Sequence, residues 1–408
     1  MPDVIPPPLQ TPPHTAAQAG RARAAEATHR RGAAATLAAA AAVGTGMAGC
    51  PPDAPPPPPP AGDSYPDTPP AVLAPERLRL VQRATFGVNA READLAAALG
   101  PRGYVNYHID YSAIDDEEVA AFLGRLPSLG LSAAERVRLQ ETDEEAFDRT
   151  VDDFFAATHW RAAYSRRQLY ERMVHFWSNH FSIYFWDEIL PILKPIDDRD
   201  VMRPHALGNF PDLLHATAKS PAMLVYLDNY RSNNEAPNQN YARELLELHT
   251  IGADGFTQED VKEVARCFTG WSIDDDFEAA GVGTFMFEPE WHDDGPKRVL
   301  GFDIPAGGGM RDGEIVLDIL SREPAVAPMT AQRLGRKLAI EFWGYDPPQA
   351  LVDDIAASYL STGGDIRAMV RSALDEDWLR RAAPKLKRPY HLVVSMLRTR
   401  PSTIIEAA

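Results

Sequence analysis

Cysteine is scarce in this sequence, which has two cysteines among 408 residues. Two thiols cannot build a disulfide framework or a thiolate zinc site, so both classes of protein are excluded. Basic residues are also in deficit, with 41 Lys and Arg against 58 Asp and Glu and a formal net charge of −17. Nucleic-acid binding depends on clustered Lys and Arg, so this balance argues against a nucleic-acid partner.

Familiar catalytic motifs are missing as well. The sequence has no P-loop, no dinucleotide-binding glycine fingerprint, no nucleophile elbow, no His-Glu-x-x-His and no Cys-x-x-Cys. Hydrophobic residues make up 45% of the chain, which at this length is enough for a large core. Any active site must therefore be inferred from less specific groups of residues.

The first 49 residues follow the order of a secretory signal. A region with four arginines ends in Arg30 and Arg31, and an alanine-rich apolar run follows as far as Gly49. This run is too short and too weakly hydrophobic for a membrane span. The other interpretation is an alanine-rich disordered tail. The arginine pair hints at twin-arginine export, but the residues after it do not complete that motif, so the export route stays open.

Cys50 directly follows an Ala-Gly pair, as in a bacterial lipobox, although Met47 stands where leucine is usual. We expect Cys50 to be the lipidated first residue of the mature protein, with the membrane as its partner. Eleven of the twenty residues 51–70 are proline, which favours an extended, semi-rigid spacer. The expected organisation of this exported cell-envelope protein is a signal peptide over 1–49, a linker over 50–74 and a helical domain over 75–408.

The rest of the chain has the pattern of a helical protein. From about residue 75 onward, apolar residues recur with a period of 3.6, and Pro and Gly mark the turns. One segment differs, because residues 284–287 and 298–302 flank a polar loop and are expected to pair as a β-hairpin. The sequence predicts a mainly α fold, a single large multi-helix domain with one small β-hairpin.

A first candidate site is the helix expected over residues 238–251. At 100° per residue, Arg243, Glu244 and Glu247 share one polar face, while Leu248 and His249 lie on the opposite, apolar face. Two carboxylates one turn apart, oriented by an arginine, could bind a cation or act as a general base. The alternative is a solvated helix face with an ordinary Arg–Glu contact.

A second candidate site joins two histidines. His180 falls on the apolar side of its helix with Met173 and Trp177, and His249 likewise lies on a buried face. Buried imidazoles need partners, so the two could share a divalent metal or pair with a carboxylate. The alternative is that each is a core histidine with its hydrogen bonds satisfied.

A third candidate lies in the polar loop of the expected hairpin, which holds His292, Asp293 and Lys297. A mobile loop with these groups could cover a site and supply acid–base chemistry. The alternative is ordinary Asp-Gly turn chemistry with a solvated lysine.

Several segments, in sequence order, match the motifs of one bacterial family. They are residues 79–87, 176–181, 240–250, 256–261 and 265–271, followed by His292, Asp293, Lys297, Leu300 and Gly301. Over about residues 77–397 the chain resembles the family called domain of unknown function 1800.

The resemblance implies an exported, largely helical protein with no established activity and no established functional residues. Genes of this family often neighbour those of a twin-arginine-exported, sulfatase-like family, which implies such a protein as a partner in an envelope system. Family members usually continue past the segment equivalent to residues 387–390, so we expect this chain to be truncated at its C-terminus.

Two functions follow as hypotheses. The first is an envelope enzyme, metal-assisted in one version, with His180 and His249 as ligands, Glu244 or Glu247 as ligand or base, and His292 and Asp293 on a covering loop. It predicts that these side chains converge in one pocket. The second is a non-catalytic lipoprotein that binds an envelope polymer or escorts a partner, in which the same residues form internal salt bridges.

Overall fold

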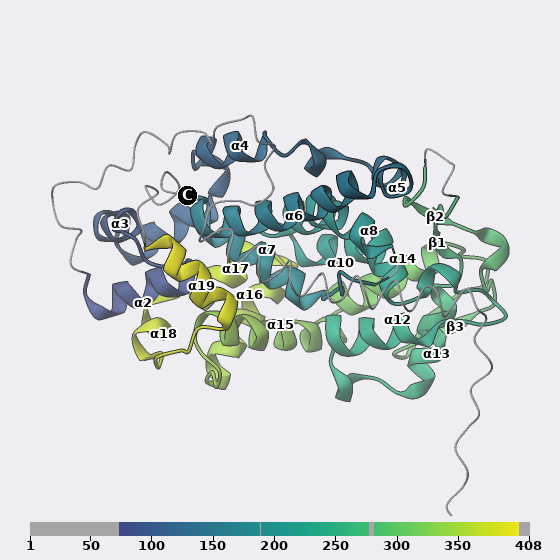
Figure 1. Cartoon of the computed structure of the whole chain (residues 1–408). Helices are drawn as coiled ribbons and strands as arrows, with labels where there is room; N and C mark the ends of the chain where they lie inside the picture. The colour runs from purple at the N-terminus through teal and green to yellow at the C-terminus, as the bar shows by residue number, and fades with distance from the viewer. Residues whose placement is uncertain (1–72, 188, 277–280, 400–408) are drawn as a thin grey trace, which may run out of the picture.

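The computed structural model describes residues 73–187, 189–276 and 281–399. The expected signal peptide, the lipidated Cys50 and nearly all of the proline-rich linker lie outside these residues. Within them, no helix combines the length and the apolar character needed to cross a membrane. Helices dominate the described part (Figure 1), which confirms the mainly α prediction.

The first third of the fold is a series of helices joined by short turns. Side-chain caps define several of their starts: Asn89 accepts a hydrogen bond from the Glu92 amide, and Ser132 and Glu135 form a reciprocal capping box. The helices are α2 (Pro75–Ala84), α3 (Ala90–Ile109), α4 (Glu117–Leu123), α5 (Ala133–Thr142), α6 (Glu144–Tyr164) and α7 (Gln168–His180).

The middle of the chain includes two turns of π-helix, a wider and rarer winding than the α-helix. These are η3 (Asp198–Met202) and η5 (Leu245–His249). The α-helices of this part are α8 (Leu190–Asp197), α9 (Arg203–His205), α10 (Phe210–Ala218), α11 (Pro221–Tyr226), α12 (Gln239–Glu244) and α13 (Gln258–Cys267).

The last third returns to the beginning of the fold. The Arg79 guanidinium of the first helix donates a hydrogen bond to the Leu379 carbonyl oxygen at 2.8 Å, which ties the two ends of the described chain together. The helices are α14 (Arg311–Arg322), α15 (Ala327–Phe342), α16 (Gln349–Thr362), α17 (Ile366–Ala373), α18 (Glu376–Arg381) and α19 (Pro389–Arg398).

The expected hairpin between residues 284–287 and 298–302 is wrong in its pairing. Two antiparallel pairs are found instead, β1 (Trp271–Ile273) with β2 (Phe285–Phe287), and β3 (Lys297–Val299) with β4 (Phe302–Ile304). The reason is the two-residue turn between β3 and β4, where Leu300 and Gly301 both have positive φ. Such a turn closes a hairpin on itself, so β3 pairs with the strand that follows it.

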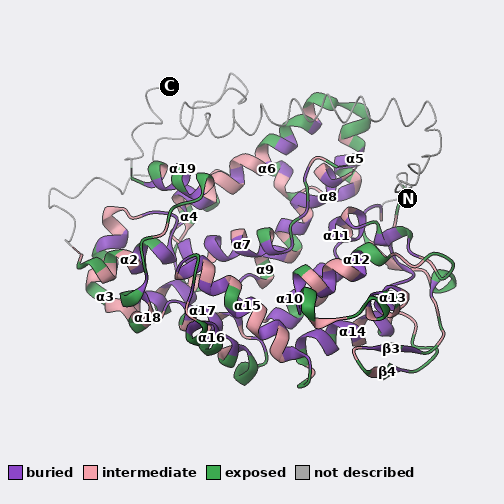
Figure 2. Cartoon of the chain, turned by 90° about the horizontal axis from the view of Figure 1, so that it is seen from below, coloured by how far each residue is buried: buried purple, intermediate pink, exposed green. Residues whose placement is uncertain are grey.

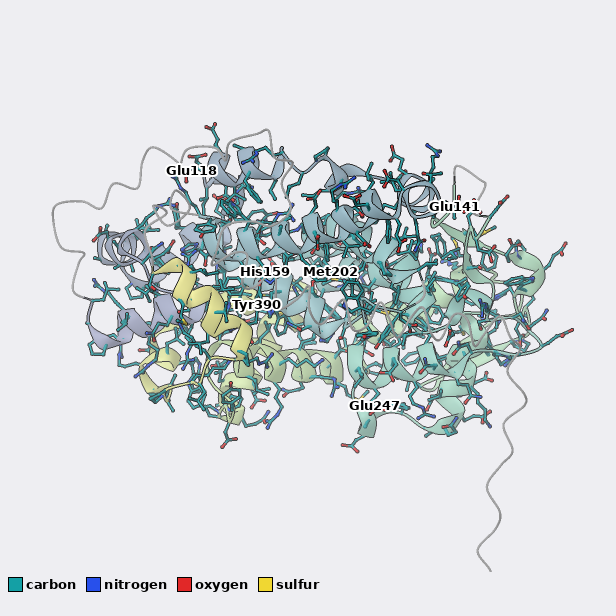
Figure 3. All side chains as sticks on the ribbon, viewed as in Figure 1. Glu118, Glu141, His159, Met202, Glu247 and Tyr390 are labelled. Atoms are coloured by element: carbon teal, nitrogen blue, oxygen red, sulfur yellow. The ribbon has the colours of Figure 1, made fainter. Side chains whose placement is uncertain are left out.

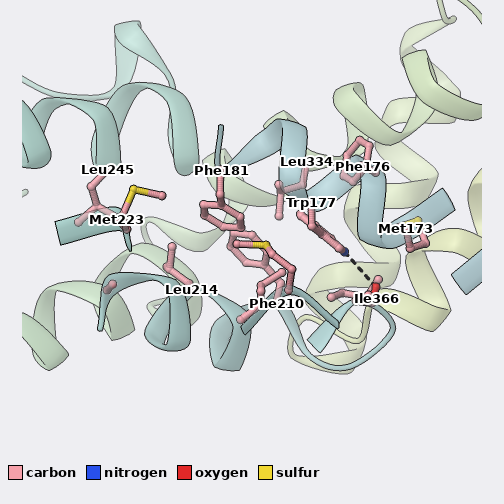
Figure 4. Packing of buried hydrophobic residues seen from close by; sticks show 14 of the residues in the cluster. Met173, Phe176, Trp177, Phe181, Phe210, Leu214, Met223, Leu245, Leu334 and Ile366 are labelled. Carbon is pink, nitrogen blue, oxygen red and sulfur yellow. Dashed lines mark hydrogen bonds between the residues drawn. The ribbon is translucent and has the colours of Figure 1, made fainter. Parts of the chain in front are cut away.

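A continuous apolar core runs through the described residues (Figure 2), with buried positions on the inner sides of the helices. At its centre, Trp177, Phe181 and Phe210 are completely buried (Figure 4), and the Trp177 indole nitrogen donates to the Ala206 carbonyl oxygen at 3.0 Å. Helices α15 and α16 also approach closely, because Gly335 has no side chain where the Val352 carbonyl oxygen lies against it. This packing fixes α7 and α15, the two helices that carry the candidate site.

Candidate acid–base site

The π-turn η5 decides which side chains around His249 are buried. An α-helix continued past Glu244 would bury Leu248, as the sequence predicted, but the wider winding leaves that side chain 44% exposed. Leu245, Leu246 and His249 are buried instead. The expectation for Leu248 is therefore wrong, and the burial expected for His249 is confirmed.

His180 and His249 meet at the point where α7 ends against η5. The His180 Nε2–H donates to the His249 carbonyl oxygen at 3.0 Å, and the two ring centroids are 6.2 Å apart. A carbonyl oxygen accepts only, so this bond places the proton of a neutral His180 ring on Nε2 and leaves Nδ1 as an acceptor. The sequence correctly expected two buried imidazoles, and the structure brings them together.

Lys337 on α15 completes this contact and is the residue that the sequence analysis missed. Its Nζ donates to His180 Nδ1 at 2.8 Å and to the Leu248 carbonyl oxygen at 3.1 Å. The one signal in the sequence was the spacing of Arg333 and Lys337, one turn apart on the same helix. Nothing in that spacing points to His180, which is 157 residues away.

Burial lowers the pKa values of Lys337, His180 and His249, which favours the uncharged form of each side chain. Burial, together with the charge of Arg333, lowers the pKa of Lys337 from 10.5 to about 8. Burial is also the main reason that the pKa of His180 lies well below its usual value, with the Lys337 charge as the next cause. The pKa of His249 falls to about 3 for the same two reasons. Both imidazoles are therefore neutral at neutral pH, and the Lys337 amine beside them loses its proton at a lower pH than is usual for a lysine.

Lys337 also lines a pocket of about 700 Å³ between α15 and the turn over residues 251–255. Arg333 and Arg336 line the same pocket, and neither guanidinium makes a hydrogen bond within the part of the chain that the structure describes; the buried Nε of Arg333 has no partner. Gly252, with φ of +90°, lets the backbone pass close to Arg333, where a Cβ would lie 3.1 Å from NH1. The pocket thus presents three cations and few acids to a ligand.

The predicted carboxylates do not reach this contact. Arg243 donates to Gln258 Oε1 instead of orienting Glu247, and Figure 3 shows Glu247 at the edge of the molecule. Burial and the neighbouring Glu247 raise the pKa of Glu244, with Arg243 acting in the opposite direction. No hydrogen bond joins Glu244 or Glu247 to His180 among the described residues.

The donors around His180 do not fit the metal site that the sequence suggested. Both ring nitrogens are engaged, one with a carbonyl oxygen and one with an ammonium group, so a metal ion would have to displace Lys337. Over residues 73–399, leaving aside the undescribed positions, no three His, Cys, Asp or Glu side chains come together as metal ligands. The His180–His249 pair is therefore an imidazole contact completed by the Lys337 ammonium group.

The loop with His292, Asp293 and Lys297 is fastened to the core. His292 Nδ1 lies 2.8 Å from the Thr269 carbonyl oxygen, and both His292 Nε2 and Lys297 Nζ contact Asp312 Oδ2, at 3.2 and 2.6 Å. The side chains of this trio, His292, Lys297 and Asp312, are completely buried.

Asp293 is held separately, by two hydrogen bonds from the Arg266 guanidinium at 2.7 and 3.0 Å, and these bonds lower the pKa of its carboxyl group. Every polar group of this loop that the sequence proposed for chemistry thus has an internal partner, which favours the structural interpretation of the loop over a mobile cover.

Comparison with known proteins places the chain in a family without assigning it a reaction. No curated protein and no solved structure matches it. One family model, described as a protein of unknown function, matches residues 79–408, which is most of the chain. The resemblance seen in the sequence motifs is thereby confirmed, and the chain belongs to the DUF1800 family.

Proposed function

We propose that this protein is an exported enzyme of the cell envelope, anchored by lipid on Cys50, that carries out acid–base chemistry on an anionic substrate at Lys337. The observation that supports it best is the Lys337 amine, which is hydrogen-bonded to a neutral buried imidazole and lines a pocket with two arginines whose guanidinium groups make no hydrogen bond to the described residues. A perturbed pKa in a cleft, with a specific partner, is typical of functional sites.

In this proposal Lys337 is the general base. With a pKa of about 8, a useful fraction of the amine is unprotonated near neutral pH and can take a proton from a bound substrate. His180 orients the amine through Nδ1, and the His249 carbonyl oxygen orients His180 in turn. Arg333 and Arg336 would hold the anionic group of the substrate and stabilise negative charge that develops when the proton leaves.

The location in the envelope rests on the sequence alone. The signal pattern over residues 1–49, the cysteine after Ala-Gly and the proline-rich spacer together support export and a lipid anchor. In that setting a sulfatase-like exported protein, encoded nearby in other members of the family, is a proposed partner that acts on the same material.

A second candidate function is binding without turnover, of an anionic envelope polymer. It is favoured by the same two arginines, because guanidinium groups that make no hydrogen bond to the described part of the chain suit a repeating anionic chain as well as a small substrate. The two functions differ at Lys337, which binding needs only as one positive charge among three.

The first experiment is to measure the acetylation rate of each lysine of the full chain across pH, with acetic anhydride and peptide mass spectrometry. Lys337 is expected to react with a midpoint near pH 8, and the exposed Lys262 serves as the internal control for reagent and pH. His180→Ala should raise the pH midpoint of Lys337 acetylation. Water would fill the space left by the imidazole and reduce the desolvation that lowers the pKa of the amine. An ordinary midpoint for Lys337 would remove the support for a general base.

A second experiment separates the enzyme from the binding protein. Anionic glycans and phosphate or sulfate esters are screened for turnover and binding with the wild type, Lys337→Met and Arg336→Met. The enzyme predicts that Lys337→Met loses turnover while keeping measurable binding, and that Arg336→Met raises KM. Binding without turnover that both substitutions weaken equally would favour the second function.

A further inference from the structure

A second cavity, of about 530 Å³, lies on the other side of the core, where α4 packs against α6. Figure 1 shows α4 above α6 in that view. The walls come from the 112–123 segment, from the end of α6 and from the start of α7. Its size is in the usual range for a site that takes a small molecule.

Arg161 at the end of α6 is under-bonded in this cavity. Its side chain is only 18% exposed, and its guanidinium makes no hydrogen bond within the described residues. Its nearest carboxylate oxygen, Asp198 Oδ2, is 3.9 Å away and already accepts from Arg203 Nε at 2.7 Å. Burial, and next the charge of Arg203, lower the pKa of Arg161. Its N–H groups are therefore available to a ligand carboxylate, and such charge-assisted hydrogen bonds are stronger than those between neutral groups.

The neighbouring Glu171 carboxylate is engaged by another arginine. Arg203 forms a bidentate pair with Glu171, at 3.0 and 3.1 Å, so each oxygen of that carboxylate already accepts one hydrogen bond, and Glu171 acts on Arg161 through its charge alone. Arg167 also lines the cavity. Among the described residues its guanidinium donates one hydrogen bond, from Nε–H to the Ile114 carbonyl oxygen at 3.0 Å. Two guanidinium groups with unused N–H donors therefore border one cavity, an arrangement suited to a planar carboxylate.

The opposite rim is acidic, which limits what kind of anion can enter. Asp115 is paired with Arg166 at 3.2 Å, and Asp116 accepts hydrogen bonds from the Ser165 hydroxyl and the Arg166 amide. Glu117 lines the same rim, and its carboxylate has no ion pair in the described part of the chain. A polyanion would be repelled here, whereas a ligand with an ammonium group would be attracted.

We propose that this cavity binds a zwitterionic ligand of the amino-acid type, with its carboxylate on Arg161 and Arg167 and its ammonium group on Glu117. The remaining wall is apolar, formed by Ile114, Val119 and Leu123, so the ligand carries an aliphatic side chain. This site is separate from the pocket of Lys337 and does not depend on the function proposed there.

The test is calorimetric titration of the full chain with three probes of similar shape: leucine, 4-methylpentanoate, which lacks the ammonium group, and leucinamide, which lacks the carboxylate. Leucine should bind saturably, and each analogue should bind at least about tenfold more weakly. Arg161→Met should abolish binding of leucine and of 4-methylpentanoate. The matched control is Arg149→Met, on the exposed side of the same helix α6, which should change nothing.

Glu117→Gln keeps the test decisive if Arg161→Met fails to fold, because Glu117 is exposed and its replacement leaves the core intact. This variant should weaken leucine binding about tenfold and leave 4-methylpentanoate unchanged. The proposal is overturned if no probe binds the wild type, if leucine and 4-methylpentanoate bind equally well, or if both variants bind leucine as the wild type does.

Discussion

Replacing Lys337 by methionine is expected to remove the unfavourable free energy of burying a protonated amine at neutral pH. The matched change, Lys297→Met, is expected to do the opposite. Lys297 contacts the Asp312 carboxylate at 2.6 Å with both side chains fully buried, so its removal breaks a buried ion pair and leaves that carboxylate with His292 alone, at about 3–5 kcal/mol. Lys337 has no carboxylate partner among the described residues, and its hydrogen bonds go to an imidazole and a carbonyl oxygen.

The magnitude follows from the shift in pKa. A change from 10.5 in the unfolded chain to about 8 in the folded protein corresponds to about 3 kcal/mol of unfavourable free energy while the amine is protonated in both states. Methionine removes this cost but also removes the donor to His180, which costs about 1–3 kcal/mol. At about pH 7 the stability of the variant should therefore lie between that of the wild type and about 2 kcal/mol above it.

The dependence on pH is the sharper observable. Between about pH 8 and 10.5 the unfolded chain holds the Lys337 proton that the folded protein has lost, so wild-type stability rises with pH over this window. Lys337→Met has no such proton. The difference in unfolding free energy between the wild type and this variant should shift in favour of the wild type by about 2 kcal/mol from about pH 7 to about pH 9.5.

The assay is urea denaturation of the wild type, Lys337→Met and Lys297→Met at a series of pH values, read by circular dichroism and near 25 °C. Taking differences between proteins cancels groups that titrate alike in both. If Lys337→Met loses as much stability as Lys297→Met at neutral pH, and the difference does not change with pH, then Lys337 is a structural lysine and the acid–base site has no support.

Three further predictions concern other buried groups. Arg172 and Glu341 form a buried ion pair at 2.6 Å, so Glu341→Gln alone should lower the unfolding free energy by about 3–5 kcal/mol. The double variant Arg172→Met with Glu341→Leu should recover most of that stability, and an equal loss in the single and double variants would contradict this. Glu92 is buried, which by itself would raise its pKa, but its hydrogen bond and charge interaction with His108 lower the pKa to about 2. Its contribution should be present above about pH 4.5 and disappear as the pH falls toward about 2, so Glu92→Gln should flatten this part of the acid denaturation curve. Metal analysis of the protein purified without chelators should find no stoichiometric zinc or transition metal, because both His180 nitrogens are engaged; a bound metal lost in both His180→Ala and His249→Ala would contradict the site described above.

The helical character of the chain was readable from its sequence because the signals for it are local. Apolar residues recur with the helical period, and the structure adds that pairs three residues apart, Ser132 with Glu135 and Thr257 with Asp260, cap helices through reciprocal hydrogen bonds. The same periodicity correctly put His180 and His249 on buried faces. It misplaced Leu248, because a π-turn changes the angle between successive side chains and has no clear signature in the sequence.

The pairing of strands was less predictable. The segment 284–287 could have paired with any extended neighbour, and the choice of β1 depends on the close approach at Gly270, where a Cβ would lie 2.5 Å from the Glu288 carbonyl oxygen. The trio of His292, Lys297 and Asp312 likewise depends on α14, which supplies the aspartate. The sequence showed His292 and Lys297 as loop residues and gave no reason to connect them with Asp312.

The sequence by itself determined the helical class of this protein, its membership of a family and the burial of its two central histidines, because each of these follows from patterns within a few tens of residues. Tertiary structure alone decided that Lys337 would bind His180 from 157 residues away and that Glu244 and Glu247 would lie apart from that contact. It also decided that Arg161 would border a cavity with no hydrogen bond from its guanidinium to the described residues. Packing of the core fixes those positions, and no local pattern encodes which side chains it brings together.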